Sequence, residues 1–70
     1  MRFEAFMARV DRLHRDQPSR RYGQLLILEL REVRPMLADT LQSGSKDPYY
    51  KQRKEECQEA LDLLNETYKD

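Results

Sequence analysis

The sequence predicts an all-α protein, a small bundle with three main helices at about residues 2–16, 20–34 and 48–68 and a short helix at about 35–42. Apolar residues recur every three or four positions in the longer stretches, which is the period of an amphipathic helix. Prolines and a glycine-containing loop separate these stretches, and no pair of β-rich segments is present to form a sheet. A length of 70 residues predicts a single helical domain, 1–70.

The first helix is predicted from one apolar stripe and from the proline that follows it. The stripe consists of Phe3, Phe6, Met7, Val10, Leu13 and His14. Because the residue before a proline avoids helical dihedral angles, we expect the helix to end before Pro18. Serine commonly caps helix N-termini, so we expect Ser19 to cap the second helix.

The second helix is apolar around most of its circumference, which is typical of the central helix of a bundle. Its apolar residues are Tyr22, Leu25, Leu26, Ile27, Leu28, Leu30 and Val33. Glycine costs about 1 kcal/mol relative to alanine inside a helix. Gly23 therefore indicates either that the helix begins there or that a neighbouring backbone approaches closely. Pro35 breaks the pattern and suits the first position of the short helix.

The last helix is predicted to follow a loop at residues 43–46, in which Gly44 suits the left-handed position after a helix end. Asp47 and Pro48 resemble an N-cap followed by a first-turn proline. The apolar stripe of this helix has a seven-residue rhythm and consists of Tyr50, Cys57, Leu61, Leu64 and Tyr68. Cations in its first turns oppose the helix dipole, so we expect this start to fray or to be held by something else.

Charge is divided unevenly along a chain whose net charge is zero. Residues 1–35 contain eight arginines and five acids, a charge of +3, whereas residues 36–70 contain five basic residues and eight acids, a charge of −3. Arginine makes fixed, bidentate contacts to carboxylate or phosphate more readily than lysine does. If the arginines of the first half share a face, that face is a candidate for binding an acidic partner. The alternative is that they pair with acids of this chain or face water.

No group of residues suited to catalysis or to a cofactor is apparent in the sequence. His14 and Cys57 are the only imidazole and thiol groups, too few ligands for a zinc site. The serines lie in predicted turns, without the glycine-flanked motifs of nucleophiles or phosphate-binding loops. We therefore predict that the protein is not an enzyme and holds no cofactor or metal. Cys57 is interpreted as a small buried apolar residue.

Membrane association and secretion are not predicted. No run approaches the ~18 apolar residues that span a bilayer, and Glu4 interrupts the start of the chain, unlike a signal peptide. A single cysteine fits a reducing compartment better than a secreted scaffold. We expect a cytoplasmic protein.

Tyr49 and Tyr50 form the most distinctive local string. We expect the Tyr50 ring to enter the core and the Tyr49 ring to remain near the surface, where tyrosine is a common interface anchor. The alternative is that both rings seal the gap between the short helix and the last one. The candidate partner-binding residues are Arg20, Arg21, Arg31, Arg34, Tyr49 and Tyr68.

Three short motifs occur at residues 21–26, 33–38 and 47–50: an aromatic-Gly-Gln helix start, a Pro-x-Leu-Ala turn and an Asp-Pro-aromatic-Tyr string. In these motifs the chain resembles a family of small helical bacterial and phage proteins that has no assigned activity. The similarity covers about residues 3–50, and the tail from Lys51 onward lies outside it. The resemblance implies a phage or mobile-element origin and transfers no functional residue.

Two functions of different classes are consistent with these features. The first is a non-enzymatic protein-protein interaction module, for example a phage or mobile-element adaptor or an inhibitor of a host protein. Exposed parts of the last apolar stripe would let it form a homodimer. The alternative is nucleic-acid binding by an arginine face, which the zero net charge and an isoelectric point below neutrality disfavour. That face would consist of Arg12, Arg15, Arg20, Arg21, Arg31 and Arg34.

Overall fold

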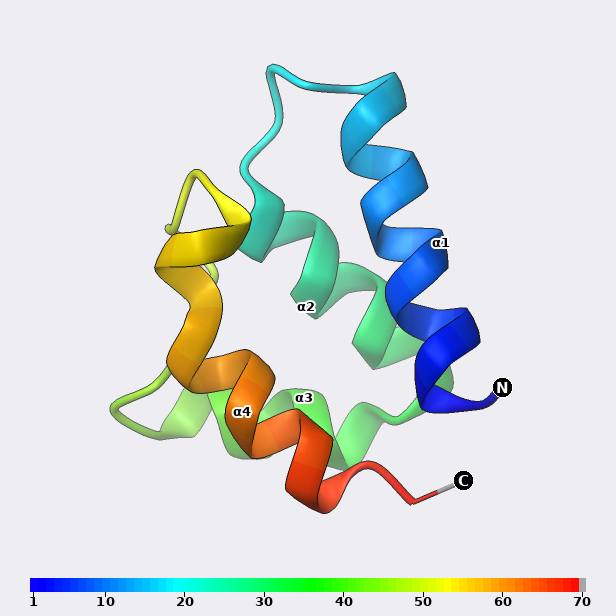
Figure 1. Cartoon of the computed structure of the whole chain (residues 1–70). Coiled ribbons are helices and arrows are strands. Elements are labelled where there is room, and N and C mark those ends of the chain that lie inside the picture. Colours follow the sequence, from blue (N-terminus) through cyan, green and yellow to red (C-terminus); the bar gives the residue numbers. More distant parts are fainter. Residues whose placement is uncertain (70) are drawn as a thin grey trace.

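All regular secondary structure in the described part of the chain is helical. The computed structural model describes residues 1–69, and no β-strand occurs among them. In chain order the elements are α1 (Phe3–Asp16), α2 (Tyr22–Val33), α3 (Pro35–Ser43), the short 3-10 helix η1 (Lys54–Cys57) and α4 (Gln58–Thr67) (Figure 1). The predicted all-α class is confirmed.

α2 is the central helix of the fold. It packs against α1 and α3, and η1 also contacts it (Figure 1). Five of the seven apolar side chains of α2 are buried, as expected for a helix that is apolar around most of its circumference. The buried apolar side chains of the core are Phe6, Val10, Tyr22, Leu25, Leu26, Ile27, Leu30, Ala38, Leu41, Cys57, Ala60, Leu61, Leu64 and Tyr68.

The first three helices lie close to their predicted ranges because prolines separate them. α1 ends at Asp16, two residues before Pro18, and α3 begins with Pro35 as its first residue. The expectation that Gly44 adopts a left-handed conformation is wrong. Its φ of −103° and ψ of 179° are extended, and any residue adopts such angles.

The N-terminus of α2 is capped by the backbone of another segment. The Tyr22 N–H donates to the Gln52 carbonyl oxygen at 3.0 Å, and the Gly23 N–H donates to the Lys51 carbonyl oxygen at 3.1 Å. These bonds satisfy two of the N–H groups that a helix start leaves without an intrahelical acceptor. The expectation that Ser19 caps this helix is therefore wrong, and no side chain caps it.

The last helix begins later than the predicted range 48–68. Residues 48–53 are not helical, and α4 follows η1 only at Gln58. Two carbonyl oxygens of this segment accept hydrogen bonds from α2 instead of from the next turn of their own helix. Asp47 consequently caps no helix, and its Oδ1 accepts the Tyr49 N–H at 3.0 Å. The expected helix start therefore does not form at residues 48–53, and this segment is held against α2 in a non-helical conformation.

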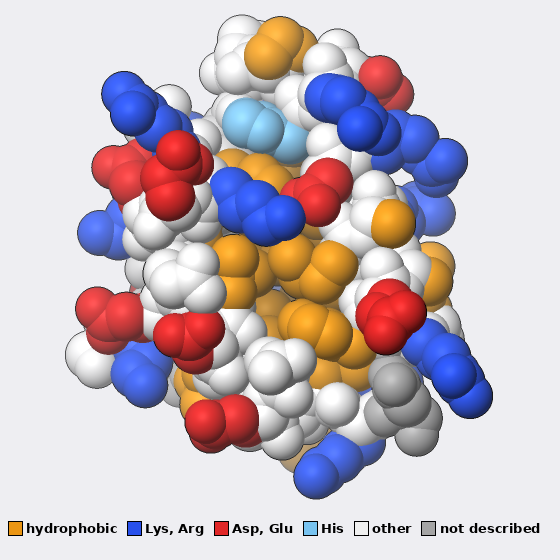
Figure 2. Space-filling model, viewed as in Figure 1, with side chains coloured by type: hydrophobic (Ala, Val, Ile, Leu, Met, Phe, Trp, Pro, Cys, Tyr) orange, Lys and Arg blue, Asp and Glu red, His pale blue; other side chains and the backbone are white. Residues whose placement is uncertain are grey.

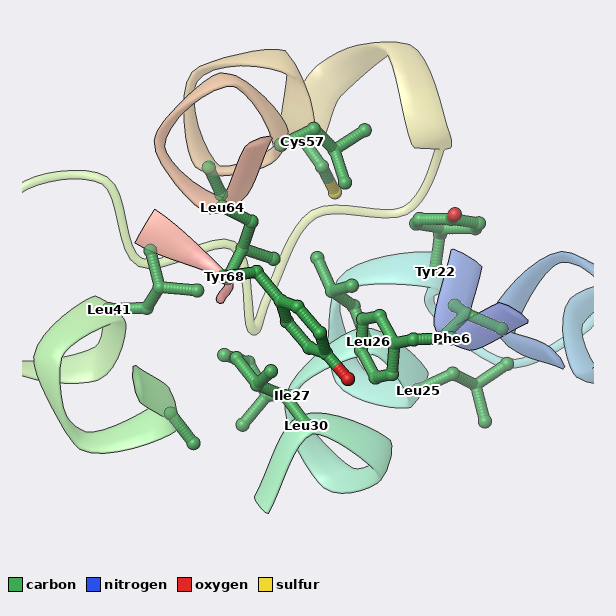
Figure 3. Close-up of a cluster of buried hydrophobic side chains, with 14 residues drawn as sticks. Phe6, Tyr22, Leu25, Leu26, Ile27, Leu30, Leu41, Cys57, Leu64 and Tyr68 are labelled. Atoms are coloured by element: carbon green, nitrogen blue, oxygen red, sulfur yellow. The ribbon is translucent and has the colours of Figure 1, made fainter. Parts of the chain in front are cut away.

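Aromatic rings from α1 and from the end of α4 meet in the core. The centroid of the Tyr68 ring lies 5.7 Å from that of Phe6 (Figure 3) and 5.4 Å from that of Phe3. The Tyr68 hydroxyl donates to the carbonyl oxygen of Met1. Cys57 is 2% exposed, which confirms the interpretation of a buried apolar residue. Both ends of the described chain are therefore fastened to the core.

A polar contact joins α1, α2 and η1. The Tyr22 hydroxyl donates to Asp11 Oδ1 at 2.6 Å, and Lys54 Nζ donates to Asp11 Oδ2 at 3.0 Å. The His14 ring lies edge-on to the Tyr22 ring, with centroids 5.3 Å apart. Asp11 therefore receives one buried neutral donor and one exposed cation.

Candidate interaction surface

Two tyrosine rings and one guanidinium group form a cluster at the N-terminal end of α2. The ring centroids of Tyr49 and Tyr50 are 5.1 Å apart, and the rings meet edge-to-face at 74°. Arg21 Cζ lies 5.5 Å from the Tyr49 centroid and 5.3 Å from the Tyr50 centroid, both within the range of cation–π attraction. Arg21 Nε also donates to the Tyr49 carbonyl oxygen at 3.3 Å. The guanidinium group is therefore held by both rings and by one hydrogen bond.

The two tyrosines are placed opposite to the expectation from sequence. Tyr50 is 76% exposed, whereas Tyr49 is half-buried, packs against the core and accepts a hydrogen bond from Gln24 Nε2 at its hydroxyl, at 3.3 Å. The expectation that Tyr50 enters the core is wrong because the helix that would direct it inward does not form there. Instead the Lys51 N–H donates to the Pro48 carbonyl oxygen at 2.8 Å, closing a turn with both tyrosines at its central positions.

The loop that carries the tyrosines lies directly on the backbone of α2 at Gly23. A Cβ atom at this position would stand 1.6 Å from the Pro48 carbonyl oxygen. Both interpretations of Gly23 from the sequence are confirmed, because α2 begins at Tyr22 and a neighbouring backbone approaches closely. The glycine thus allows the loop to reach α2.

Side chains of α2 extend the cluster along the helix. Gln24 lies about one turn after Arg21, and Leu28 about one turn after Gln24, so the three share one side of the helix. Leu28 is 42% exposed, an unusual exposure for a large apolar residue of this central helix. We call the surface formed by Arg21, Gln24, Leu28, Tyr49 and Tyr50 the tyrosine patch. Tyrosine and arginine are enriched among the residues that dominate protein–protein binding energies.

Arg20 and Arg31, both predicted to bind a partner, make contacts within the protein. Arg20 Nη1 donates to Gln17 Oε1 at 3.2 Å. Arg31 Nη1 donates to Asp39 Oδ1 at 2.7 Å, and its Nη2 donates to Gln42 Oε1. The Arg31 contacts link α2 to α3, so this arginine has a structural role.

Arg34 and Tyr68 lie at the opposite end of α2 from the tyrosine patch. Arg34 Cζ stands 4.7 Å from the Tyr68 ring centroid. Its Nη1 and Nη2 donate to the carbonyl oxygens of Val33, at 2.9 Å, and Lys69, at 3.1 Å. Tyr68 is 6% exposed. Because this ring is buried in the core, we do not include Tyr68 in the interaction surface.

The arginines considered for nucleic-acid binding do not form one compact patch. Arg21 and Arg34 flank opposite ends of α2, which at 12 residues is about 18 Å long. Arg31, between them, is paired with Asp39. Arg12 is exposed on α1. Only Arg21 is combined with exposed aromatic surface.

The ionisable groups with shifted pKa values are buried in the core. Burial, followed by the nearby charge of Glu56, raises the pKa of the Cys57 thiol to about 11. Burial, followed by the hydrogen bond to Asp11, raises the pKa of Tyr22. A buried thiol that stays protonated near neutral pH is a poor nucleophile. Within residues 1–69, no three His, Cys, Asp or Glu side chains lie close enough together to hold a metal ion.

Apolar side chains also gather between α1 and α4, on the face shown in Figure 2. Phe3 and Met7 of α1 are partly buried against the core. The large apolar side chains with the highest exposure are Met1, Leu28, Met36 and Tyr50. Two of these four, Leu28 and Tyr50, belong to the tyrosine patch.

Comparison with known proteins does not identify a relative. No family model, curated protein or solved structure matches this chain. Among residues 1–69, none of the helices has both the length and the apolar character needed to cross a membrane.

The places of Gln24, Leu28 and Tyr50 in the tyrosine patch are not among the expectations from sequence. The spacing of positions 21, 24 and 28 places them on one side of a helix, which is a signal that the sequence contains. The apolar residues of α2 itself lie around most of its circumference. The sequence therefore does not indicate which side of the helix is exposed.

Proposed function

We propose that this protein binds another protein through the tyrosine patch and catalyses no reaction. The observation that carries this proposal is the exposed ring of Tyr50, 76% accessible, beside a guanidinium group that two rings hold in place. Tyrosine supplies a large contact area with few rotatable bonds, so little conformational entropy is lost on binding. Arginine adds directional donors beside it.

The energetics of covering the patch favour binding. An aromatic side chain buries roughly 150–250 Å² of surface, and burial stabilises by roughly 25 cal/mol per Å², so covering Tyr50 contributes a few kcal/mol. Arg21 and Tyr49 are already ordered by their mutual contacts, which reduces the cost of fixing them in a complex. A small patch with ordered anchors is typical of the central part of a protein interface.

Self-association through the last apolar stripe has less support than binding through the patch. Four residues of that stripe, Cys57, Leu61, Leu64 and Tyr68, are buried in the core of a single chain. The remaining one, Tyr50, belongs to the tyrosine patch. We therefore place the contact surface on the patch and not on α4.

The test is an affinity capture in which the wild type and two variants of the full chain are immobilised and exposed to a lysate of the cells whose genome encodes the protein. The proteins that each chain retains are then compared. Tyr50→Ser removes the exposed ring of the patch, whereas Met36→Ser removes an equally exposed apolar side chain on α3, 81% accessible. We expect one and the same protein to be retained by the wild type and by Met36→Ser and lost with Tyr50→Ser. Retention that is equal for all three chains, or that a nuclease abolishes, would falsify the proposal.

A further inference from the structure

We propose that the tyrosine patch recognises an acidic peptide segment of its partner, in which a carboxylate binds Arg21 and a neighbouring apolar side chain packs on Tyr50. This inference rests on the proposed function and specifies the chemistry of the partner.

Arg21 is a positioned cation that lacks an anion. Its Nε is bonded to the Tyr49 carbonyl oxygen, while its two terminal nitrogens have no acceptor among residues 1–69. Two other arginines of the bundle are paired with acids of the chain itself. Arg9 pairs with Glu29 at 3.0 Å, and Arg31 pairs with Asp39 at 2.7 Å. The terminal nitrogens of Arg21 are therefore left for water or for an acceptor on a partner.

The free end of the Arg21 guanidinium group matches a carboxylate. Its two terminal nitrogens are presented as a planar fork, and a carboxylate offers two oxygen atoms at the same spacing. Two tyrosine rings and one hydrogen bond already hold the fork, so binding does not have to order it. A guanidinium group in cation–π contact keeps its full charge and is partly shielded from water, which strengthens a charge-assisted hydrogen bond.

The charge near the patch attracts an acidic segment. Residues 46–54, which include both tyrosines, contain four cations and one acid, and one of these cations, Lys54, is paired with Asp11 of α1. That acid, Asp47, already accepts the Tyr49 N–H. Arg20 and Arg21 add two cations immediately before α2. A local positive potential of this kind speeds association with a negatively charged partner and selects against basic ones.

An acidic peptide fits the patch better than a nucleic acid does. Single-stranded nucleic acids bind to successive stacked rings along a continuous cationic groove. Here only Tyr50 presents a well-exposed ring, because Tyr49 is half-buried and contacts Arg21 and Gln24. Glu55 and Glu56 follow directly after the cations and interrupt the positive charge. Phosphopeptide sites in turn use clusters of arginines, whereas one free guanidinium group matches one carboxylate.

The experiment selects peptides from a displayed random library on the immobilised full chain. The selected peptides are synthesised with a fluorescent label, and their binding is measured by anisotropy. Each is also made with glutamine or asparagine in place of its acids. Protein variants are Arg21→Gln and Arg21→Lys, and Arg12→Gln serves as a matched control at an exposed arginine of α1. Labelled oligothymidine and a phosphoserine version of each peptide are measured in parallel.

We expect the selected peptides to share an aspartate or glutamate beside an apolar residue. Affinity should fall about tenfold or more when that acid becomes an amide, and similarly with Arg21→Gln, because a charge-assisted bidentate contact is lost. Arg21→Lys keeps the charge without the fork and should also lose most of this affinity, whereas Arg12→Gln should leave it unchanged. The amide peptides test the contact without altering the protein, so the result does not depend on the folding of a variant.

Three results would overturn the inference. These are the absence of any selected peptide, peptides that bind equally well as amides, and preferential binding of oligothymidine or of the phosphoserine version. Capture of a protein by the wild type that requires Tyr50 but is unaffected by Arg21→Gln would leave the proposed function intact and reject the acidic segment alone.

Discussion

The carbonyl oxygen of Pro48 occupies the space beside Gly23 in which any other residue would place its side chain. The φ angle of Gly23 is not positive, so the glycine is not explained by an unusual backbone conformation. The close approach explains it, together with the hydrogen bond from the Gly23 N–H to the Lys51 carbonyl oxygen. The start of the central helix and the loop that presents Tyr50 are therefore built as one unit.

Replacement of Gly23 by alanine should destabilise the protein. Helix propensity alone favours alanine by about 1 kcal/mol. The Pro48 backbone, however, would have to move away from the new methyl group, which disturbs the bonds that cap α2. Forced backbone shifts of this kind cost about 1–3 kcal/mol or more. We expect a net loss of about 1–2 kcal/mol in the free energy of unfolding, measured by urea denaturation followed by far-UV circular dichroism.

Gly44→Ala is the matched control for this measurement. The nearest atom to a Cβ at position 44 is the Thr40 carbonyl oxygen at 3.4 Å, an ordinary contact. We expect its free energy of unfolding to stay within about 0.5 kcal/mol of the wild type. If Gly23→Ala were as stable as Gly44→Ala, the close approach of the loop to α2 would be refuted.

The helix boundaries near prolines could be predicted from sequence because proline acts locally. Pro18 and Pro35 restrict their own and the preceding dihedral angles, whatever the rest of the chain does. The start of the last helix could not be predicted in this way. It depends on hydrogen bonds from α2 to the carbonyl oxygens of Lys51 and Gln52, which lie far from α2 in sequence.

Two of the candidate partner-binding residues indicated by the sequence, Arg21 and Tyr49, lie in contact in the structure. The exposure of Tyr50 was missed because its place in a seven-residue apolar rhythm suggested a core position. An apolar residue that fits a helical rhythm is expected to be buried only if the helix includes that residue. Here Tyr50 lies in a turn instead of in the helix.

Tyr22→Phe should lower stability without changing the packing of the ring. The Tyr22 hydroxyl donates to the Asp11 carboxylate at 2.6 Å, and a hydrogen bond to a charged group contributes about 1.5–3 kcal/mol. We expect a loss in that range by urea denaturation. Lys54→Met is the control, since its ion pair with Asp11 is 49% and 38% exposed at the two side chains and contributes about 1 kcal/mol at most. Equal losses in the two variants would contradict this assignment.

Stability should decrease as the pH rises above 9. Burial, followed by Glu56, raises the pKa of Cys57 from 9.0 to about 11, so the unfolded thiol loses its proton at a lower pH than the folded one. The stabilisation from this group is complete below pH 9 and is lost between pH 9 and 11. Tyr22, whose pKa burial and Asp11 also raise, adds a further loss above its ordinary pKa of 10.0.

The contribution of Cys57 to this alkaline loss can be separated with Cys57→Ala. Urea denaturation of both proteins across the interval from pH 9 to 11 gives the free energy of unfolding at each pH. The wild type should lose stability more steeply than the variant at the start of this interval, although the variant is less stable throughout because its core contains a cavity. Parallel curves would show that the thiol ionises equally readily in the folded and unfolded protein.

Arg34→Lys should loosen the end of the chain without affecting the tyrosine patch. Arg34 donates to the carbonyl oxygens of Val33 and Lys69 and lies over the Tyr68 ring, contacts that need its planar fork. Lysine keeps the charge but reaches fewer of these acceptors, so we expect a loss of about 1 kcal/mol in the free energy of unfolding. Amide hydrogen exchange should become faster near Tyr68, where the last turn of α4 is held.

The same variant tests whether the contacts of Arg34 are independent of the binding proposed for Arg21. Arg34 and Arg21 lie at opposite ends of α2, so Arg34→Lys should retain the partner that Tyr50→Ser loses. Arg12→Lys, at an exposed position of α1, should change neither stability nor exchange. Faster exchange at residues 49–52 in Arg34→Lys, or loss of the partner, would mean that the two ends of α2 are coupled. The end that holds Tyr68 would then contribute to the interaction surface, as the sequence first suggested.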